Sequence, residues 1–596
     1  MFQETPVATA APVRRVNAAS PPRLSFVYAL LLSLPALLLG YLMYTYAVDV
    51  PFGDQWDGIG PLFEKMRAGT LGFGDFFAFH NEHRIFFPRL LIFPLAKLTH
   101  WNVRAEVGLI WVLACLCAVN IWRVATVTGF RGERSRTWLL FGAYVLLFTP
   151  MQWENVLWGF QVGFFFPLVT MTAMPWAACA VRRPANFFVT AVLCLMTTFS
   201  IASGFTSWLL AAPLLMYCGN QQKSPRESIA RVIWLTTAAV SVGIYFYGYV
   251  GPDHHPNQLE ALQQPVLLSQ FILAYLGNPF CYGTALNTHA MAQIAGSVLL
   301  LLLIAVAIYL WRCRRDRSLI ANALPWLSIA GITLFNAVLT MFGRMGYGVR
   351  GALQSRYVSF AVMLPIALLF LGALIERHWR EKRPRSAKLL RTGYAVGIAL
   401  FTTLFLFSTF GTLRNWPSFQ HDRFTAKAVL ALRDIVNEPT AIARYVHWNV
   451  PRARELAETV ESVGYLRPTR LHSAHLREIA RPTSGLTVGE VNAAIQTPDG
   501  GGITVGWAIL PTRERAADSV LLAYETVAGD PIIFARVNVR TIRGDIEAKF
   551  DDSSYRRSGW EFTWGPNDVP KDAIRITAWA FDAEDVSAYE IGVIRP

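Results

Sequence analysis

Long apolar runs recur along the first two thirds of the chain, and short polar segments separate them. A helix that crosses a bilayer needs about 20 apolar residues, and on this basis we expect about eleven transmembrane helices. Their expected positions are 25–47, 105–127, 138–151, 161–181, 187–203, 205–219, 231–250, 288–311, 320–342, 355–376 and 391–410. A shorter run at 85–98 is interrupted by Pro88, Arg89 and Pro94, and it predicts an interfacial helix.

The pattern changes after residue 410, where charged residues become frequent. Residues 411–486 show the amphipathic spacing of short helices, which predicts a helical connector. From 487 to 596, short segments alternate apolar and polar residues and are separated by turn sequences such as Asp499-Gly500. Roughly seven to eight strands of this kind predict an all-β sandwich at the C-terminal end.

Basic residues give the predicted spans an orientation. Alternate loops carry clusters of Arg and Lys, as does the polar segment 1–24, whereas 152–160 and 251–287 carry none. The positive-inside rule places the basic loops and the N-terminus in the cytoplasm. The first outer loop (48–104), the stretch 343–356 and everything after residue 410 are then expected on the opposite, extracytoplasmic face.

The composition agrees with a polytopic α-helical membrane protein. Of 596 residues, 53% are hydrophobic and 16% are charged, and the mean hydropathy is +0.34. The net charge of +14 lies in short clusters between apolar runs. Nucleic-acid binding would instead require a basic face with interleaved aromatic residues. The seven cysteines show neither a disulfide framework nor zinc-ligand spacing.

Candidate chemistry gathers in the first outer loop, where acids, imidazoles and an arginine lie among many aromatic residues. A carboxylate in a partly apolar pocket at a membrane surface can act as a general base or bind a divalent metal, and Asp54 is our candidate. The alternative for Asp54 is a cap on the helix predicted to run through Ala68. For Asp57 and Asp75 we favour a structural role.

The same loop contains the motif HNEHR at 80–84. On a helix, His80, His83 and Arg84 would share one face. Imidazoles and an arginine suit a phosphate, whereas histidine with Glu82 suits a metal, for which His83 joins Asp54 as a candidate ligand. The spacing differs from that of zinc proteases. An interfacial cap on the following helix is the equally weighted alternative.

Glu154 follows Trp153 in a second outer segment. This pair fits a sugar-binding edge, where an indole stacks on a pyranose ring and the acid accepts hydrogen bonds from hydroxyls. The alternative is an aromatic belt at the membrane interface, but a belt needs no acid. The motif Asp253-His254-His255 fits a solvated loop better than a metal site.

A third outer segment, GRMGYGVRGALQSRY, contains Arg344, Arg350 and Arg356. Three arginines on the outer face oppose the positive-inside bias, which indicates an anionic ligand such as a lipid phosphate. Headgroup binding and salt bridges to the first loop are the alternatives. We favour a ligand role above all for Arg356, which begins the next predicted span.

The order of one span, a long outer loop that opens with an Asp, further spans and an outer soluble domain resembles the GT-C glycosyltransferases. The resemblance covers 25–410 and rests on GDQWD, HNEHRIFFPRL and GRMGYGVRGALQSRY. Asp54 stands where the family typically has its base. Gln55 replaces the second acid frequent in the family, which leaves dependence on a divalent cation (Mg²⁺ or Mn²⁺) open. The tail is similar in general terms to the carbohydrate-binding modules of some members.

The resemblance implies inverting transfer of a sugar from a polyprenyl-phosphate donor to a glycan or lipid-linked acceptor, in a bacterial inner membrane. Asp54 would deprotonate the acceptor hydroxyl, and Arg356 and Arg344, with His83 or Arg84, would stabilise the leaving phosphate. Two other functions stay open. An O-antigen polymerase or ligase would carry its key loop later in the chain. A lipid or polysaccharide transporter would show repeated halves and broken helices.

Overall fold

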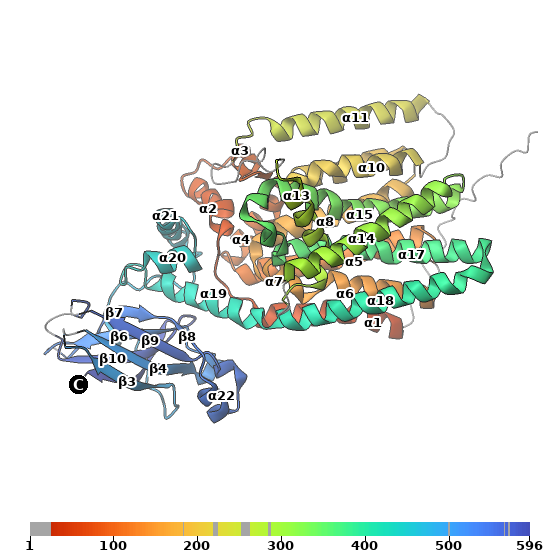
Figure 1. Cartoon of the computed structure of the whole chain (residues 1–596). Coiled ribbons are helices and arrows are strands. Elements are labelled where there is room, and N and C mark those ends of the chain that lie inside the picture. The colour runs from red at the N-terminus through yellow and green to blue at the C-terminus, as the bar shows by residue number, and fades with distance from the viewer. Residues whose placement is uncertain are drawn as a thin grey trace, which may run out of the picture.

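The computed structural model describes residues 26–595, except 131, 183, 218–224, 252–262, 284–287, 499–500, 528, 566 and 570–572. The expected cytoplasmic tail 1–24 and the Asp253-His254-His255 motif lie outside the described residues. Long helices lie side by side in one bundle, and a β-sandwich lies beyond one end of it (Figure 1). The structure therefore joins an apolar helical body to a separate all-β part.

Among the described residues, eight helical segments are long and apolar enough to cross a membrane. They contain α1 (Phe26–Tyr46), α5 (Val103–Val127), α8 (Val162–Ala180), α11 (Pro225–Phe246), α14 (Thr288–Arg312), α15 (Arg317–Arg344), α17 (Met363–Lys382) and α18 (Pro384–Leu413). This confirms the helical class and indicates a multi-pass membrane protein.

The other three predicted spans also form helices, but these are short. They are α6 (Glu133–Leu147), α9 (Ala185–Thr198) and α10 (Thr206–Tyr217), with 15, 14 and 12 residues. At 1.5 Å per residue they are about 18–23 Å long, whereas the hydrocarbon core of a bilayer is about 30 Å thick. The count of about eleven spans therefore stays a prediction.

Short elements gather at the end of the bundle nearest the sandwich (Figure 1). Among them are α2 (Asp54–Arg67), α3 (Phe73–Phe77), α4 (Phe86–Thr99), α7 (Trp153–Leu157) and α13 (Pro265–Gly277). The interfacial helix expected at 85–98 is α4. Charge alternation places the loops that contain these elements on one side of the membrane. In the structure these loops also lie at the same end of the bundle.

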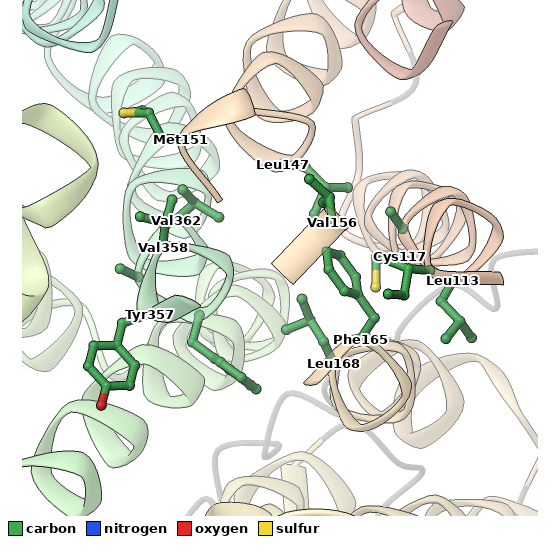
Figure 2. Packing of buried hydrophobic residues seen from close by; sticks show 14 of the residues in the cluster. Leu113, Cys117, Leu147, Met151, Val156, Phe165, Leu168, Tyr357, Val358 and Val362 are labelled. Carbon is green, nitrogen blue, oxygen red and sulfur yellow. The ribbon is translucent and has the colours of Figure 1, made fainter. Parts of the chain in front are cut away.

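The bundle has a continuous apolar core that reaches these short elements. Figure 2 shows Leu113 of α5, Val156 of α7, Phe165 of α8 and Val358 of α16 (Val358–Ala361) in one cluster of buried residues. Because α7 contributes fully buried side chains to this core, the residues beside them are held in fixed positions relative to the long helices.

A helical connector joins the bundle to the sandwich. It consists of α19 (Asn415–Ala431), α20 (Pro439–Tyr445) and α21 (Val450–Ser462), which confirms the helices expected in 411–486. Arg452 of α21 forms a two-pronged ion pair with Glu64 of α2, at 2.7 and 2.6 Å. The connector is thus packed onto the first outer loop.

The C-terminal part is built from two antiparallel sheets, with strand orders β11-β10-β6-β7 and β3-β4-β9-β8 and with β5 paired to β4. The strands are β3 (Gly489–Gln496), β4 (Gly502–Leu510), β5 (Arg515–Ala516), β6 (Ser519–Glu525), β7 (Ile532–Val537), β8 (Val539–Thr541), β9 (Gly559–Trp564), β10 (Arg575–Asp582) and β11 (Ser587–Arg595). Residues of both sheets share one buried core, so the predicted sandwich is confirmed. The helix α22 (Gly544–Phe550) was not predicted.

Candidate functional site

Asp54 is the first residue of α2 and is half-buried. The preceding Gly53 has φ +53° and donates its N–H to the Val446 carbonyl of the connector at 2.9 Å. A glycine favours this backbone conformation, and a β-carbon there would also lie 3.2 Å from the Trp158 ring. No described residue donates a hydrogen bond to the Asp54 carboxylate. The Asp54 side chain therefore does not cap α2.

Three imidazoles and a guanidinium lie within electrostatic range of Asp54. Its charge acts on His80, His83 and His447, and also on Arg356. Burial lowers the pKa of His80 to about 4, and it also lowers the pKa of His83, in both cases against the opposing charge of Asp54. Both side chains are consequently neutral at neutral pH, and Arg356 is a permanent positive charge within electrostatic range of Asp54.

The HNEHR motif forms a hairpin, and the expectation of a shared helix face was wrong. Strands β1 (Phe79–His80) and β2 (His83–Arg84) pair with His80 directly opposite His83. Asn81 in the two-residue turn has φ +50°, a conformation that Asn tolerates and that a helix does not contain. Residues directly opposite in an antiparallel pair point to the same face, so the two imidazoles still lie together.

The second histidine is held in one tautomer. His83 Nδ1 accepts a hydrogen bond from the Ala202 N–H at 3.0 Å, so the proton of the neutral ring lies on Nε2. That nitrogen is 3.6 Å from Glu82 Oε1, which also accepts from Arg344 Nη2 at 3.0 Å. Glu82 therefore links the hairpin to one of the three predicted arginines.

Arg84 has a different environment. Its guanidinium donates to the backbone carbonyls of Tyr245 at 2.8 Å, of Phe77 at 3.0 Å and of Tyr247, and it lies 3.9 Å from the centroid of the Phe79 ring. All three nitrogens are thus bonded within the protein. Arg84 therefore binds the hairpin to the end of α11.

Glu154 and Arg356 meet across the bundle. Glu154 Oε2 accepts from the Arg356 backbone N–H at 3.2 Å, and the Glu154 N–H donates to Ser355 Oγ at 3.1 Å. Burial raises the pKa of Glu154, and the charge of Arg356 opposes that rise. Arg356 Nε is buried, and no described residue accepts a hydrogen bond from it. One donor of this arginine therefore remains available to a ligand.

Trp153 is half-buried at the edge of this cluster. Its indole N–H donates to the Tyr282 hydroxyl at 3.1 Å, and its ring packs on Phe419 of α19 at 5.2 Å between centroids. Stacking on a sugar would use the remaining face, so the predicted sugar-binding role of Trp153 stays a prediction.

The three arginines of the late outer segment do not converge. Arg356 is bonded through its backbone to Glu154, Arg344 pairs with Glu82, and Arg350 is exposed and lines a separate cavity with His289. The segment is divided into short 3-10 turns, η5 (Met345–Tyr347), η6 (Val349–Leu353) and η7 (Ser355–Tyr357). These turns change the direction of the chain between one arginine and the next, which the spacing alone did not reveal.

Sequence reasoning missed His447 of the connector. Its Nε2 lies 2.8 Å from Asp57 Oδ2, and the imidazole is almost completely buried. Burial would lower the pKa of His447, but its pairing with Asp57 and the charge of Asp54 raise that pKa overall. No local motif marks His447, because it reaches the site only through the packing of α20 and α21 on α2.

A buried carboxyl group next to Asp54 was also missed. Glu106, in the first turn of α5, accepts hydrogen bonds from the Gln55 amide and from the Trp101 indole, the latter at 3.0 Å. A Glu within a long apolar run was a usable signal. The Gln55 amide is thus bonded within the protein, since its oxygen also accepts a hydrogen bond from the Phe52 N–H at 3.4 Å.

Within the part of the chain that the structure describes, no three His, Cys, Asp or Glu side chains are arranged to hold a metal ion. Asp54 and His83, the predicted metal candidates, are near each other but have no third ligand of that kind among the described residues. No protein-family model, curated protein or solved structure matches this chain.

Proposed function

We propose that this protein is a membrane glycosyltransferase that moves a sugar from a polyprenyl-phosphate donor to a hydroxyl of a glycan or lipid-linked acceptor. The observation that carries the proposal is the Asp54 carboxylate, to which no described residue donates a hydrogen bond, within electrostatic range of Arg356, whose Nε is buried and unsatisfied. A base and a phosphate-binding cation in one site are what transfer from a lipid phosphate requires.

In the proposed reaction, Asp54 takes the proton of the acceptor hydroxyl as its oxygen attacks the anomeric carbon. The new glycosidic C–O bond forms while the bond from the anomeric carbon to the phosphate oxygen breaks. The polyprenyl phosphate leaves with the electron pair of that bond. Attack from the face opposite the phosphate inverts the anomeric configuration, and no separate general acid is needed.

Arg356 would neutralise the charge that develops on the leaving phosphate. Its position is set through its backbone, which is bonded to Glu154 and to the Asn155 amide, the latter at 2.6 Å. His80 Nε2 is buried and lacks a described partner, so it offers a second polar contact near Asp54. His83 and Arg344 would support the site from the hairpin, and we omit Arg84 because its guanidinium is already bonded.

A transporter is less well supported. Asn336 is the polar residue that stands out within the late spans, and a transport path would leave such a group to a substrate. Its Oδ1 accepts from Ser203 Oγ at 2.8 Å, and its Nδ2 donates to the Ile332 carbonyl at 2.9 Å. The amide is therefore used in helix packing.

The test compares Asp54→Asn with the native chain and with Asp75→Asn, using purified full-length protein and a panel of polyprenyl-phosphate sugars. Asp75 is the matched control, because it lies on the same loop and only caps α3 through the Gly72 N–H at 2.8 Å. We expect Asp54→Asn to lower kcat/KM by about 100-fold or more, since a general base is lost. Full activity of Asp54→Asn would refute the proposed role of Asp54.

A further inference from the structure

A polar cavity lies at the loop end of the bundle, and Asp54 is not among the residues that line it. Its volume is about 390 Å³. The polar side chains that line it are Gln270 of α13, His289 and Gln293 of α14, and Tyr347 and Arg350 of the segment that follows α15. None of the lining residues is an acid.

The frame of the cavity is tightly built. At Gly277 of α13 and Gly296 of α14 an added β-carbon would lie 1.9 Å from a backbone carbonyl oxygen of the other helix, so the two backbones touch. The third wall is the segment that contains Tyr347 and Arg350. It is held to the end of α13 by Asn278, whose Nδ2 donates to the Gln354 carbonyl at 3.0 Å. The cavity is therefore a fixed feature of the packing of α13, α14 and η6.

The lining has the chemistry of an anion site. Arg350 is exposed, and no described residue accepts a hydrogen bond from its guanidinium. His289 Nδ1 is buried and has no partner among the described residues. With the amides of Gln270 and Gln293 these groups provide several donors around one positive charge, an arrangement suited to a phosphate.

The surroundings of the cavity favour a lipid as the source of that phosphate. On the two helices that line it, Val266 of α13 and Ile294 of α14 expose 66% and 60% of their surface. The candidate membrane span of α14 begins at His289, so the cavity lies where the span meets the headgroup region. Arg350 also opposes the positive-inside bias, as expected of an arginine held by an anion.

From these observations we propose that the cavity binds the phosphate of an anionic lipid headgroup, at a site distinct from the one formed by Asp54 and Arg356. The two sites are joined by one stretch of chain, because Arg350 and Arg356 lie on the successive turns η6 and η7. This proposal does not depend on glycosyl transfer, and the cavity can hold either a substrate lipid or a lipid of the bilayer.

The experiment measures binding of short-chain phosphatidic acid to the purified full-length protein in detergent, by native mass spectrometry. We expect Arg350→Gln to weaken binding by about tenfold or more, because a hydrogen-bonded charge pair is lost. His289→Gln should weaken it less. Arg444→Gln is the matched control, since Arg444 is an exposed arginine of α20 and should leave binding unchanged.

The other arms identify the ligand and separate this proposal from the first. Inorganic phosphate should bind much more weakly than the lipid, and equal binding would overturn the lipid assignment. Binding that is equal in Arg350→Gln and the native protein would overturn the site itself. Asp54→Asn should keep full lipid binding at this cavity. A failure of the proposed catalytic role of Asp54 can therefore be distinguished from a failure of the lipid site.

Discussion

At the residue scale, burial determines which imidazoles of the candidate site are neutral. Asp54 keeps a free carboxylate, whereas His80 and His83 are neutral because burial lowers their pKa values. The remaining imidazole, His447, is the exception, since its pairing with Asp57 outweighs burial. The site therefore contains one histidine that stays protonated to higher pH than usual and two that do not.

This difference predicts a pH-dependent stability. His447 has a raised pKa in the folded protein, so its pairing with Asp57 stabilises the fold below the ordinary imidazole pKa of 6.5 and is lost as the pH rises through the raised value. The pKa of Asp57 is lowered: burial would raise it, but His447 outweighs this, helped by His80 and Arg452. The stabilisation that the ionised Asp57 contributes is therefore lost only in acid, as the pH falls below the ordinary carboxyl pKa of 3.8.

We accordingly expect His447→Asn to lower Tm more at about pH 5.5 than at about pH 8.5. Thermal unfolding of the detergent-solubilised protein measures this. His472→Asn serves as the control, because His472 is exposed and its replacement should change Tm little at either pH. An equal loss of stability at both pH values would show that the pair of His447 and Asp57 is not ionised.

At the scale of elements, short-range pattern and long-range packing contribute differently. Hydrophobic runs located the long helices, and alternation located the strands of the sandwich. The shared face of HNEHR was considered on a helix, and the hairpin was not foreseen, because spacing alone does not reveal a left-handed Asn81. The close crossing of α13 and α14 was also invisible, since nothing local indicates which glycines face another backbone.

That crossing gives a stability prediction. Gly277→Ala should destabilise the protein by about 1–3 kcal/mol, because its β-carbon would overlap the Ala292 carbonyl oxygen and the backbones must separate. Gly393→Ala in α18 is the control, since a β-carbon there meets no atom within 4 Å. The change in Tm on thermal unfolding distinguishes the two variants, and equal values would mean that α13 and α14 are not in close contact.

At the scale of the whole molecule, the connector completes the first outer loop. It supplies the Val446 carbonyl that fixes Gly53, the imidazole of His447 and the Arg452 guanidinium that binds Glu64. The sandwich in turn packs on α19 through a shared apolar cluster that includes Leu432 and Phe581. The candidate site is therefore built from the first loop and the connector, two segments that lie far apart in the chain.

The alternation of charge predicts that this assembly lies on the extracytoplasmic face. In a bacterial host, a C-terminal alkaline phosphatase fusion should be active and a C-terminal green fluorescent protein fusion dark, because each reporter works on only one side of the membrane. Fusions at about residue 315, within the Arg-rich loop between α14 and α15, should show the opposite pattern. The reverse result at both positions would invert the proposed topology.

The sequence by itself determined the class of the protein, the positions of its long helices, the sandwich and the loops that hold the candidate residues. These follow from periodicity and composition, which act over a few residues. Only the tertiary structure decided that Glu154 meets Arg356, that Arg84 and Arg350 lie elsewhere, and that His447 pairs with Asp57. Such contacts join residues far apart in the chain, and they depend on burial and on turns that no local pattern specifies.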